Sequence, residues 1–226
     1  MENTGVRRVS VVACWFAAIT ASPVAGQTGS ISGTVTTIAK GAPPLRVTID
    51  QKICGDQLPD ESVVVNAQGR LANAVISVVG LKRAATSAAT VLNERCRFTP
   101  RVQLARPNAT VRTSSTDPIL HTTQAQLDTG RPLFNVALPV PGINIGKPVG
   151  TRGPVRLSCN IHPWMRGWVI VTEDASAITA TDGRFTIDDV PPGTYEVRIW
   201  HEALTGAPQK VTVTSGKTAA ITFSLR

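Results

Sequence analysis

Apolar and polar residues alternate with a period close to two in short runs along most of this chain. A period of two predicts β-strands with one buried face, and the Gly, Pro or Ser residues that end the runs predict tight turns. The run at 73–79 is apolar on both faces, and only the alanine-rich stretch 84–94 shows a weak helical period. The strand-like runs are residues 31–37, 73–79, 102–107, 109–115, 154–159, 167–173, 183–190, 194–200, 209–215 and 218–225.

The length and the composition of the chain agree with this pattern. The chain has 226 residues, 42% of them hydrophobic, with 18 glycines and 16 prolines. That length allows one large domain or two small ones. We therefore expect an all-β protein, built as a β-sandwich or a barrel.

The N-terminus has the pattern of a secretory signal. Arg7 and Arg8 precede an apolar stretch at 9–21, and small residues follow up to Gly26. The pattern predicts a signal peptide over residues 1–26 and a protein exported to the periplasm or the exterior. A membrane anchor is the alternative, but the stretch is shorter than the roughly 20 residues of a spanning helix. A lipoprotein anchor at Cys14 is disfavoured because this cysteine lies inside the apolar stretch.

The positive charge is spread along the chain. The formal net charge is +8, and the basic residues stand singly with no run and no interleaved aromatic residues. This pattern argues against nucleic-acid binding. It is compatible with an acidic protein partner or with association with an anionic envelope surface.

Three cysteines, Cys54, Cys96 and Cys159, remain after the predicted cleavage. In an oxidising compartment we expect two to pair and one to stay free. Cys159 has metal-ligand neighbours, so we expect a disulfide between Cys54 and Cys96. Sequence alone does not fix connectivity, and the other pairings stay open.

The stretch CNIHPWM at 159–165 gathers Cys159, His162 and Met165 directly after a predicted strand. His121 follows an expected turn at 117–118 and is the other histidine near this unit. Two imidazoles, a thiolate and a thioether are the ligands of mononuclear blue-copper sites. Zinc sites seldom use methionine. A buried thiol beside an ordinary histidine is the alternative interpretation.

These residues also resemble a known family. CNIHPWM resembles the amicyanin-type ligand loop of cupredoxins, and residues 98–121 resemble their Phe-x-Pro opening, strand pair and first histidine. The resemblance implies a Greek-key sandwich over 98–174 that holds one type 1 copper ion. Cupredoxins often carry asparagine after the first histidine, where this chain has Thr122. The implied ligands are His121, Cys159, His162 and Met165.

The same resemblance implies a route for electrons. Cupredoxins exchange electrons through the exposed edge of the second-loop histidine, which here is His162, with Pro163 and Trp164 beside it. His201 lies outside the unit. We interpret it as a structural or surface residue.

The C-terminal part resembles the carboxypeptidase regulatory-like family, a transthyretin-like sandwich. Earlier segments at 33–35, 43–44 and 74–76 fit the first strands of that pattern. We therefore expect a signal peptide at 1–26, an N-terminal β segment of the regulatory-like sandwich at 27–97, an inserted copper unit at 98–174 and the rest of that sandwich at 175–226. The matching C-terminal residues are Thr181, Asp182, Gly183, Phe185, Ile187, Val190, Pro191, Pro192, Gly193 and Tyr195.

Three classes of function follow from these patterns. The first is an exported blue-copper electron carrier that cycles Cu(II)/Cu(I) between redox proteins such as a cytochrome or a dehydrogenase, with copper storage or delivery as a variant. The second is a non-redox, transthyretin-like binding module of the cell envelope. An enzyme is disfavoured, because Cys159 and His162 share one short turn and no third group is evident to orient the imidazole.

Overall fold

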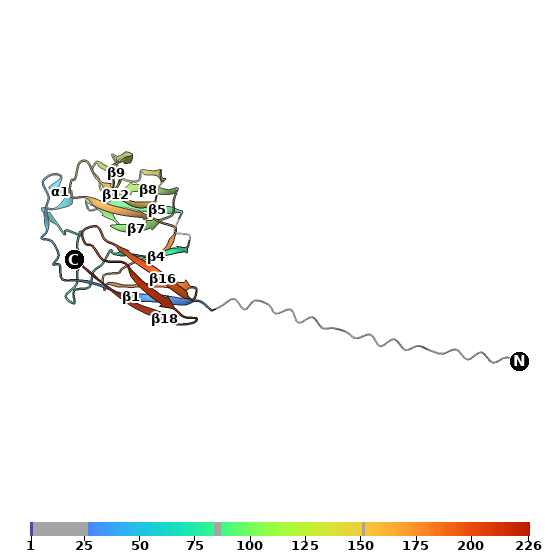
Figure 1. Ribbon diagram of the computed structural model, residues 1–226. Coiled ribbons are helices and arrows are strands. Elements are labelled where there is room, and N and C mark those ends of the chain that lie inside the picture. Colours follow the sequence, from blue (N-terminus) through green and yellow to red (C-terminus); the bar gives the residue numbers. More distant parts are fainter. Residues whose placement is uncertain (2–26, 84–86, 151) are drawn as a thin grey trace.

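The computed structural model describes Met1 and residues 27–83, 87–150 and 152–226, and nearly all of its regular elements are strands (Figure 1). The predicted all-β class is therefore confirmed. The predicted signal peptide at 1–26 lies outside the described residues except for Met1. No helix in the described ranges is long and apolar enough to cross a membrane.

Strands from the middle of the chain form one sandwich, here called the central sandwich. Its two sheets have the orders β10-β9-β12-β13-β7 and β11-β8-β5-β6. Alternate residues such as Val91, Val111, Leu157 and Val169 point inward and are fully buried, as the period of two predicts. The strands are β5 (Ala88–Glu94), β6 (Arg97–Thr99), β7 (Val102–Ala105), β8 (Ala109–Ser115), β9 (His121–Leu127), β10 (Pro132–Leu138), β11 (Asn144–Val149), β12 (Gly153–Ser158) and β13 (Arg166–Val171).

Strands from both ends of the chain form a second sandwich, here called the terminal sandwich. Its sheets have the orders β15-β1-β18 and β14-β4-β16-β17. The first and last strands, β1 and β18, pair in parallel, with Gly33 opposite Ile221. The strands are β1 (Gly29–Thr37), β4 (Val75–Lys82), β14 (Asp174–Ile178), β15 (Arg184–Val190), β16 (Gly193–Trp200), β17 (Gln209–Val213) and β18 (Thr218–Leu225).

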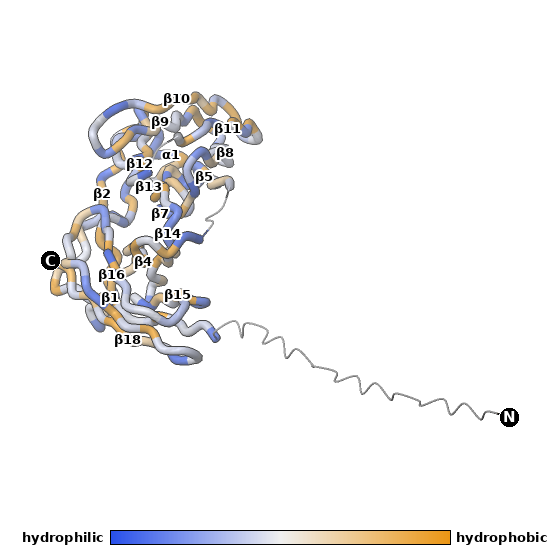
Figure 2. The backbone as a smooth tube through the Cα atoms, turned by 45° about the vertical axis from the view of Figure 1, so that its right-hand side comes forward, coloured by the Kyte–Doolittle hydropathy of each residue, from blue (hydrophilic) through white to orange (hydrophobic). Residues whose placement is uncertain are grey.

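The chain leaves the terminal sandwich and returns to it at one place. Strands β4 and β14 pair antiparallel, and the Arg83 amide donates a hydrogen bond to the Glu173 carbonyl at 2.7 Å. Everything between these two residues that the structure describes belongs to the central sandwich or its turns. In Figure 2, β4 and β14 of the terminal sandwich and β7 of the central sandwich lie where the two bodies meet.

Two expectations from the sequence differ from the observed pairing. The expected boundary at 97/98 is displaced, because β5 pairs in parallel with β8 and so belongs to the central sandwich. The weak helical period at 84–94 falls on a strand over its described part, Ala88–Glu94. Buried Ala89, Val91 and Asn93 alternate there with more exposed neighbours, so pairing and burial decide the conformation.

One segment of the N-terminal part crosses to the central sandwich. The capping segment, residues 45–58, contains β2 (Leu45–Arg46), α1 (Gln51–Cys54) and β3 (Gln57–Leu58), with β2 paired to β3. Its Val47, Cys54 and Leu58 are buried in the core of the central sandwich. The predicted Cys54–Cys96 disulfide is present and ties the segment to the turn between β5 and β6. In Figure 1, α1 lies beside the central sandwich.

A small apolar layer joins the two sandwiches. Val75 from the terminal sandwich packs with Val102 and Ile170 from the central one, and all three are buried. Trp168 and Trp200 meet edge to face across this layer, with ring centroids 5.2 Å apart. The packing holds the two bodies against one another.

Candidate metal centre

Two paired strands bring the predicted ligands together at one end of the central sandwich. His121 opens β9, and Cys159 follows directly after β12, which pairs antiparallel with β9. The turn after β12 then carries His162 and Met165 back to the start of β13. Ligand atoms of His121, Cys159 and His162 all lie within 4.8 Å of one another.

All four predicted ligands are buried. His121 and His162 are fully buried, Met165 is 1% exposed and Cys159 is 4% exposed. The two imidazole centroids are 4.7 Å apart. The Met165 amide donates to the His162 carbonyl at 2.9 Å, and Met165 packs in the same core as Cys159. The cluster is therefore shielded from water.

Each imidazole is oriented by a carboxylate. His121 Nε2 lies 2.9 Å from Asp117 Oδ2, and His162 Nε2 lies 3.0 Å from Asp50 Oδ2. A carboxylate only accepts hydrogen bonds, so Nε2 carries a proton in each ring, which leaves Nδ1 as the ring nitrogen available to a metal ion. His162 Nδ1 lies 3.6 Å from Cys159 Sγ. His121 Nδ1 is buried without a hydrogen-bond partner among the described residues. A histidine that donates one ring N–H to a carboxylate and leaves its other nitrogen unpaired has the arrangement typical of metal-binding histidines.

Asp117 is itself held by the backbone. Its two oxygens accept hydrogen bonds from the Arg95 and Cys96 amides at 2.8 and 2.9 Å. Arg95 and Cys96 both have positive φ, which points successive amides at one anion. Sequence reasoning identified Asp117 only as a turn residue and missed Asp50, which has no local signal because 112 residues separate it from His162.

The Cys159 thiol is poised as a thiolate. Burial raises its pKa, but the His121 imidazole and the amides of Thr122, His162 and Ile161 lower it more, so that the pKa falls to about 5. The Thr122 amide donates to Cys159 Sγ at 3.4 Å. The Thr122 hydroxyl lies 3.6 Å from the same sulfur and accepts a hydrogen bond from the Asn160 amide at 2.8 Å. Thr122 thus ties the two ligand loops together.

These residues fit a copper ion better than a hard cation. A thiolate and a thioether are soft donors, and neutral imidazole suits copper in both oxidation states. His121 Nδ1, buried beside the Cys159 thiol and without a hydrogen-bond partner among the described residues, is a position that a metal ion would satisfy. His121, Cys159 and His162 would hold the ion, with Met165 available as a weaker ligand.

The expected exposed edge of His162 is not found. The imidazole is fully buried, because Asp50 on the capping segment occupies the position beside Nε2. Pro163 is exposed, but Trp164 is only partly exposed, and its Nε1 donates to the Cys96 carbonyl at 3.1 Å. The sequence pattern could not show this, since the covering residue comes from outside the unit.

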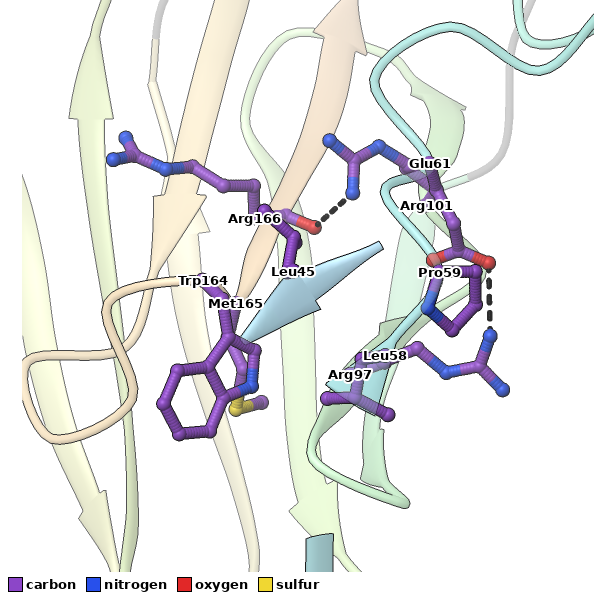
Figure 3. Close-up of a pocket in the computed structure, with 9 residues that line it drawn as sticks. All are labelled: Leu45, Leu58, Pro59, Glu61, Arg97, Arg101, Trp164, Met165 and Arg166. Atoms are coloured by element: carbon purple, nitrogen blue, oxygen red, sulfur yellow. Dashed lines mark hydrogen bonds and ion pairs between the residues drawn. The ribbon is translucent and has the colours of Figure 1, made fainter. Parts of the chain in front are cut away.

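A small cavity lies on the methionine side of the cluster. Figure 3 shows the Met165 sulfur behind the Trp164 indole, with Leu45 of the capping segment alongside. Arg97 on one wall pairs with Glu61 at 3.0 Å. The capping segment therefore borders Met165 as well as His162.

His201 takes no part in this cluster. It is buried, and its Nδ1 accepts a hydrogen bond from the Ala203 amide at 3.2 Å. Burial lowers its pKa, as does Arg101, and these effects outweigh the raising effect of Glu202. These contacts agree with the structural role that the sequence suggested.

Residues 168–226 match the carboxypeptidase regulatory-like domain. The predicted resemblance of the C-terminal part is therefore confirmed, and the match begins within β13 of the central sandwich. A search of curated proteins finds no match to this chain.

Solved cupredoxins are similar to part of the chain. A purple cupredoxin from Nitrosopumilus maritimus has 21% identity and a TM-score of 0.34, covering 37% of this chain and 99% of its own. Amicyanin from Paracoccus versutus has 19% identity and a TM-score of 0.34, covering 43% and 97%. Both the sequence identities and the TM-scores are low. The candidate metal centre is therefore inferred from this chain's own side chains.

Proposed function

We propose that this chain is an exported type 1 copper protein that carries single electrons between redox partners. One observation carries the proposal: two buried imidazoles, each held through Nε2 by a carboxylate, stand beside a low-pKa cysteine. The order of ligands along the chain, with Met165 last, supports the same proposal.

The protein's contribution is a fixed donor set. The copper ion would supply the one-electron Cu(II)/Cu(I) couple. Asp117 fixes the plane of the His121 imidazole, and Thr122 fixes the sulfur. Because the ligands are buried and held, they need little rearrangement when the charge of the site changes by one. Low rearrangement favours fast electron transfer.

The surroundings suggest the location and the partner. The predicted signal peptide supports export, and an oxidising compartment is the one in which the Cys54–Cys96 disulfide persists. A net charge of +8 favours a redox protein with an acidic face. We further propose that the central sandwich is an insertion in a regulatory-like domain, leaving at Arg83 and returning at Glu173.

A spectroscopic titration tests the function. Apoprotein given Cu(II) should turn intensely blue and give the electron paramagnetic resonance spectrum of one type 1 site, and Cys159→Ser should remove the colour. His201→Gln is the matched control and should keep it. A colourless wild-type protein that binds no copper would contradict the proposal.

A second measurement separates carrying from storage. A carrier should exchange electrons rapidly with a cytochrome and release its ion slowly to a chelator, because the ligands are buried. Fast release to the chelator with slow electron exchange would instead favour storage.

A further inference from the structure

We propose that Asp50 is a positioning residue for His162, and that the capping segment at 45–58 closes the metal centre to solvent. The inference rests on the proposed function and assigns a role to a segment that lies outside the ligand unit. It concerns how the second histidine is held and how an ion reaches it.

The backbone at Asp50 is built to present its carboxylate. Asp50 lies just before α1 with φ of 54°, and its carbonyl accepts hydrogen bonds from the amides of Ile53 and Cys54, both at 2.9 Å. The side chain makes no cap bond to the helix. It reaches instead to His162 Nε2 at 3.0 Å. A left-handed aspartate costs some free energy, and such backbone conformations are concentrated at functional sites.

The capping segment is fastened on both sides of Asp50. Before it, Val47 is fully buried, and its amide donates to the Asp56 carbonyl at 3.0 Å. After it, Cys54 is joined to Cys96. The Val47 carbonyl also accepts from Gln51 Nε2 at 2.8 Å. These contacts close the segment into a small rigid loop.

The disulfide also joins the supports of the two histidines. Cys96 donates its amide to Asp117, which holds His121, while Cys54 lies one helical turn from Asp50, which holds His162. One covalent bond therefore fixes both carboxylates relative to each other. Loss of that bond would loosen the orientation of both imidazoles.

The capping segment is what separates His162 from water. The His162 side chain is fully buried, whereas the Asp50 side chain is 35% exposed, so Asp50 is the outer group at this edge. Ile49 and Ile53 beside it are 44% and 42% exposed. An ion or a reagent that approaches along this edge must displace the capping segment.

The first test changes Asp50 alone. Asp50→Gly removes the carboxylate and suits the positive φ, and Asp50→Asn keeps an acceptor of the same shape. Cu(II) affinity is measured by chelator competition, together with the visible and electron paramagnetic resonance spectra. Asp50→Gly should weaken affinity about tenfold or more and alter the spectra, and Asp50→Asn should restore most of both. The exposed Asp128→Asn should behave as wild type.

The second test needs no metal. In the apoprotein, alkylation of Cys159 by iodoacetamide is followed by mass spectrometry of its peptide. Cys54→Ser/Cys96→Ser should speed alkylation by about tenfold or more, because removing a disulfide makes opening easier. Asp50→Gly, which keeps the disulfide, should give a smaller increase. Circular dichroism confirms that each variant is folded.

The outcomes separate this inference from the proposed function. Wild-type affinity and spectra in Asp50→Gly, or wild-type alkylation in folded Cys54→Ser/Cys96→Ser, would overturn the inference while leaving the copper site intact. Absence of Cu(II) binding by the wild-type protein would overturn the proposed function, and the alkylation rates would still decide whether the capping segment closes the site.

Discussion

Thr122 shows how a single side chain can serve both ligand loops. Its hydroxyl accepts from the Asn160 amide and lies 3.6 Å from Cys159 Sγ, while its amide donates to the same sulfur. The short threonine side chain therefore links the turn that carries Cys159 to the start of β9. The hydroxyl also stabilises negative charge on the sulfur.

Thr122→Val should lower the reduction potential of the copper-loaded protein. Without the hydroxyl, the thiolate donates more strongly to the oxidised ion and favours Cu(II). The two lost hydrogen bonds should also lower the free energy of unfolding by about 1–3 kcal/mol. Voltammetry and chemical unfolding measure the two effects. Thr122→Ser should stay near wild type, and a valine variant with an unchanged potential would contradict this role.

The spacing of the site residues along the chain decided which of them could be predicted from the sequence. Cys159, His162 and Met165 lie within seven residues, and such spacing is a local signal. Asp50 lies 112 residues from the histidine it contacts, and nothing in its neighbourhood distinguishes it from a turn residue. The burial of His162 depends on that distant contact, so the exposed edge that the ligand loop implied was wrong.

At the scale of elements, β1 is the strand that completes the terminal sandwich. It pairs with β15 on one side and with β18 on the other. Gly33 sits at the centre of this pairing, where an added Cβ would collide with the Ile221 carbonyl. The sequence indicated β1 as a strand by alternation, but its partners lie 150 or more residues away along the chain.

Gly33→Ala should therefore destabilise the protein. The collision is with backbone, which cannot move aside without breaking the β1–β18 pairing, and overpacking of this kind costs about 1–3 kcal/mol. Gly41→Ala is the matched control, since its Cβ would meet only ordinary contacts, and it should change stability by less than about 0.5 kcal/mol. Denaturant titration measures both. Equal stability of the two variants would show that β1 is not held between β15 and β18.

Strand β5 shows why element type was harder to predict than element position. Its alanines gave a weak helical period, yet the alternation of buried and exposed residues over Ala88–Glu94 matches a strand. Parallel pairing with β8 fixes the conformation, and parallel partners are distant in sequence. Alanine prefers helices, but that preference amounts to only a fraction of a kcal/mol per residue, so pairing and burial outweigh it here.

At the scale of the whole molecule, one polar cluster fastens the two sandwiches. Arg101, before β7, donates two hydrogen bonds to Glu202, after β16, at 2.6 and 2.8 Å. Trp168 Nε1 donates to the same carboxylate at 3.1 Å. The Arg101 and Glu202 side chains are 10% and 8% exposed, so the pair is largely withdrawn from water.

Glu202→Ala should be strongly destabilising. It leaves the Arg101 charge buried without its partner, and breaking a buried pair on one side costs about 3–5 kcal/mol. Glu196→Ala, which removes an exposed partner of Arg198, should cost less than about 1 kcal/mol. Thermal and chemical unfolding measure the difference. A Glu202 variant as stable as the Glu196 variant would mean that the cluster does not fasten the two bodies.

The adjacency of Arg83 and Glu173 has a consequence for how such a molecule can arise and be redesigned. The two ends of the central sandwich meet at one backbone hydrogen bond. For the terminal sandwich, the whole insertion is therefore equivalent to one long loop between β4 and β14. The entropic cost of closing a loop grows only slowly with the length of the loop. The terminal sandwich can therefore accept a different inserted domain at this junction, provided that the first and last residues of that domain also lie side by side.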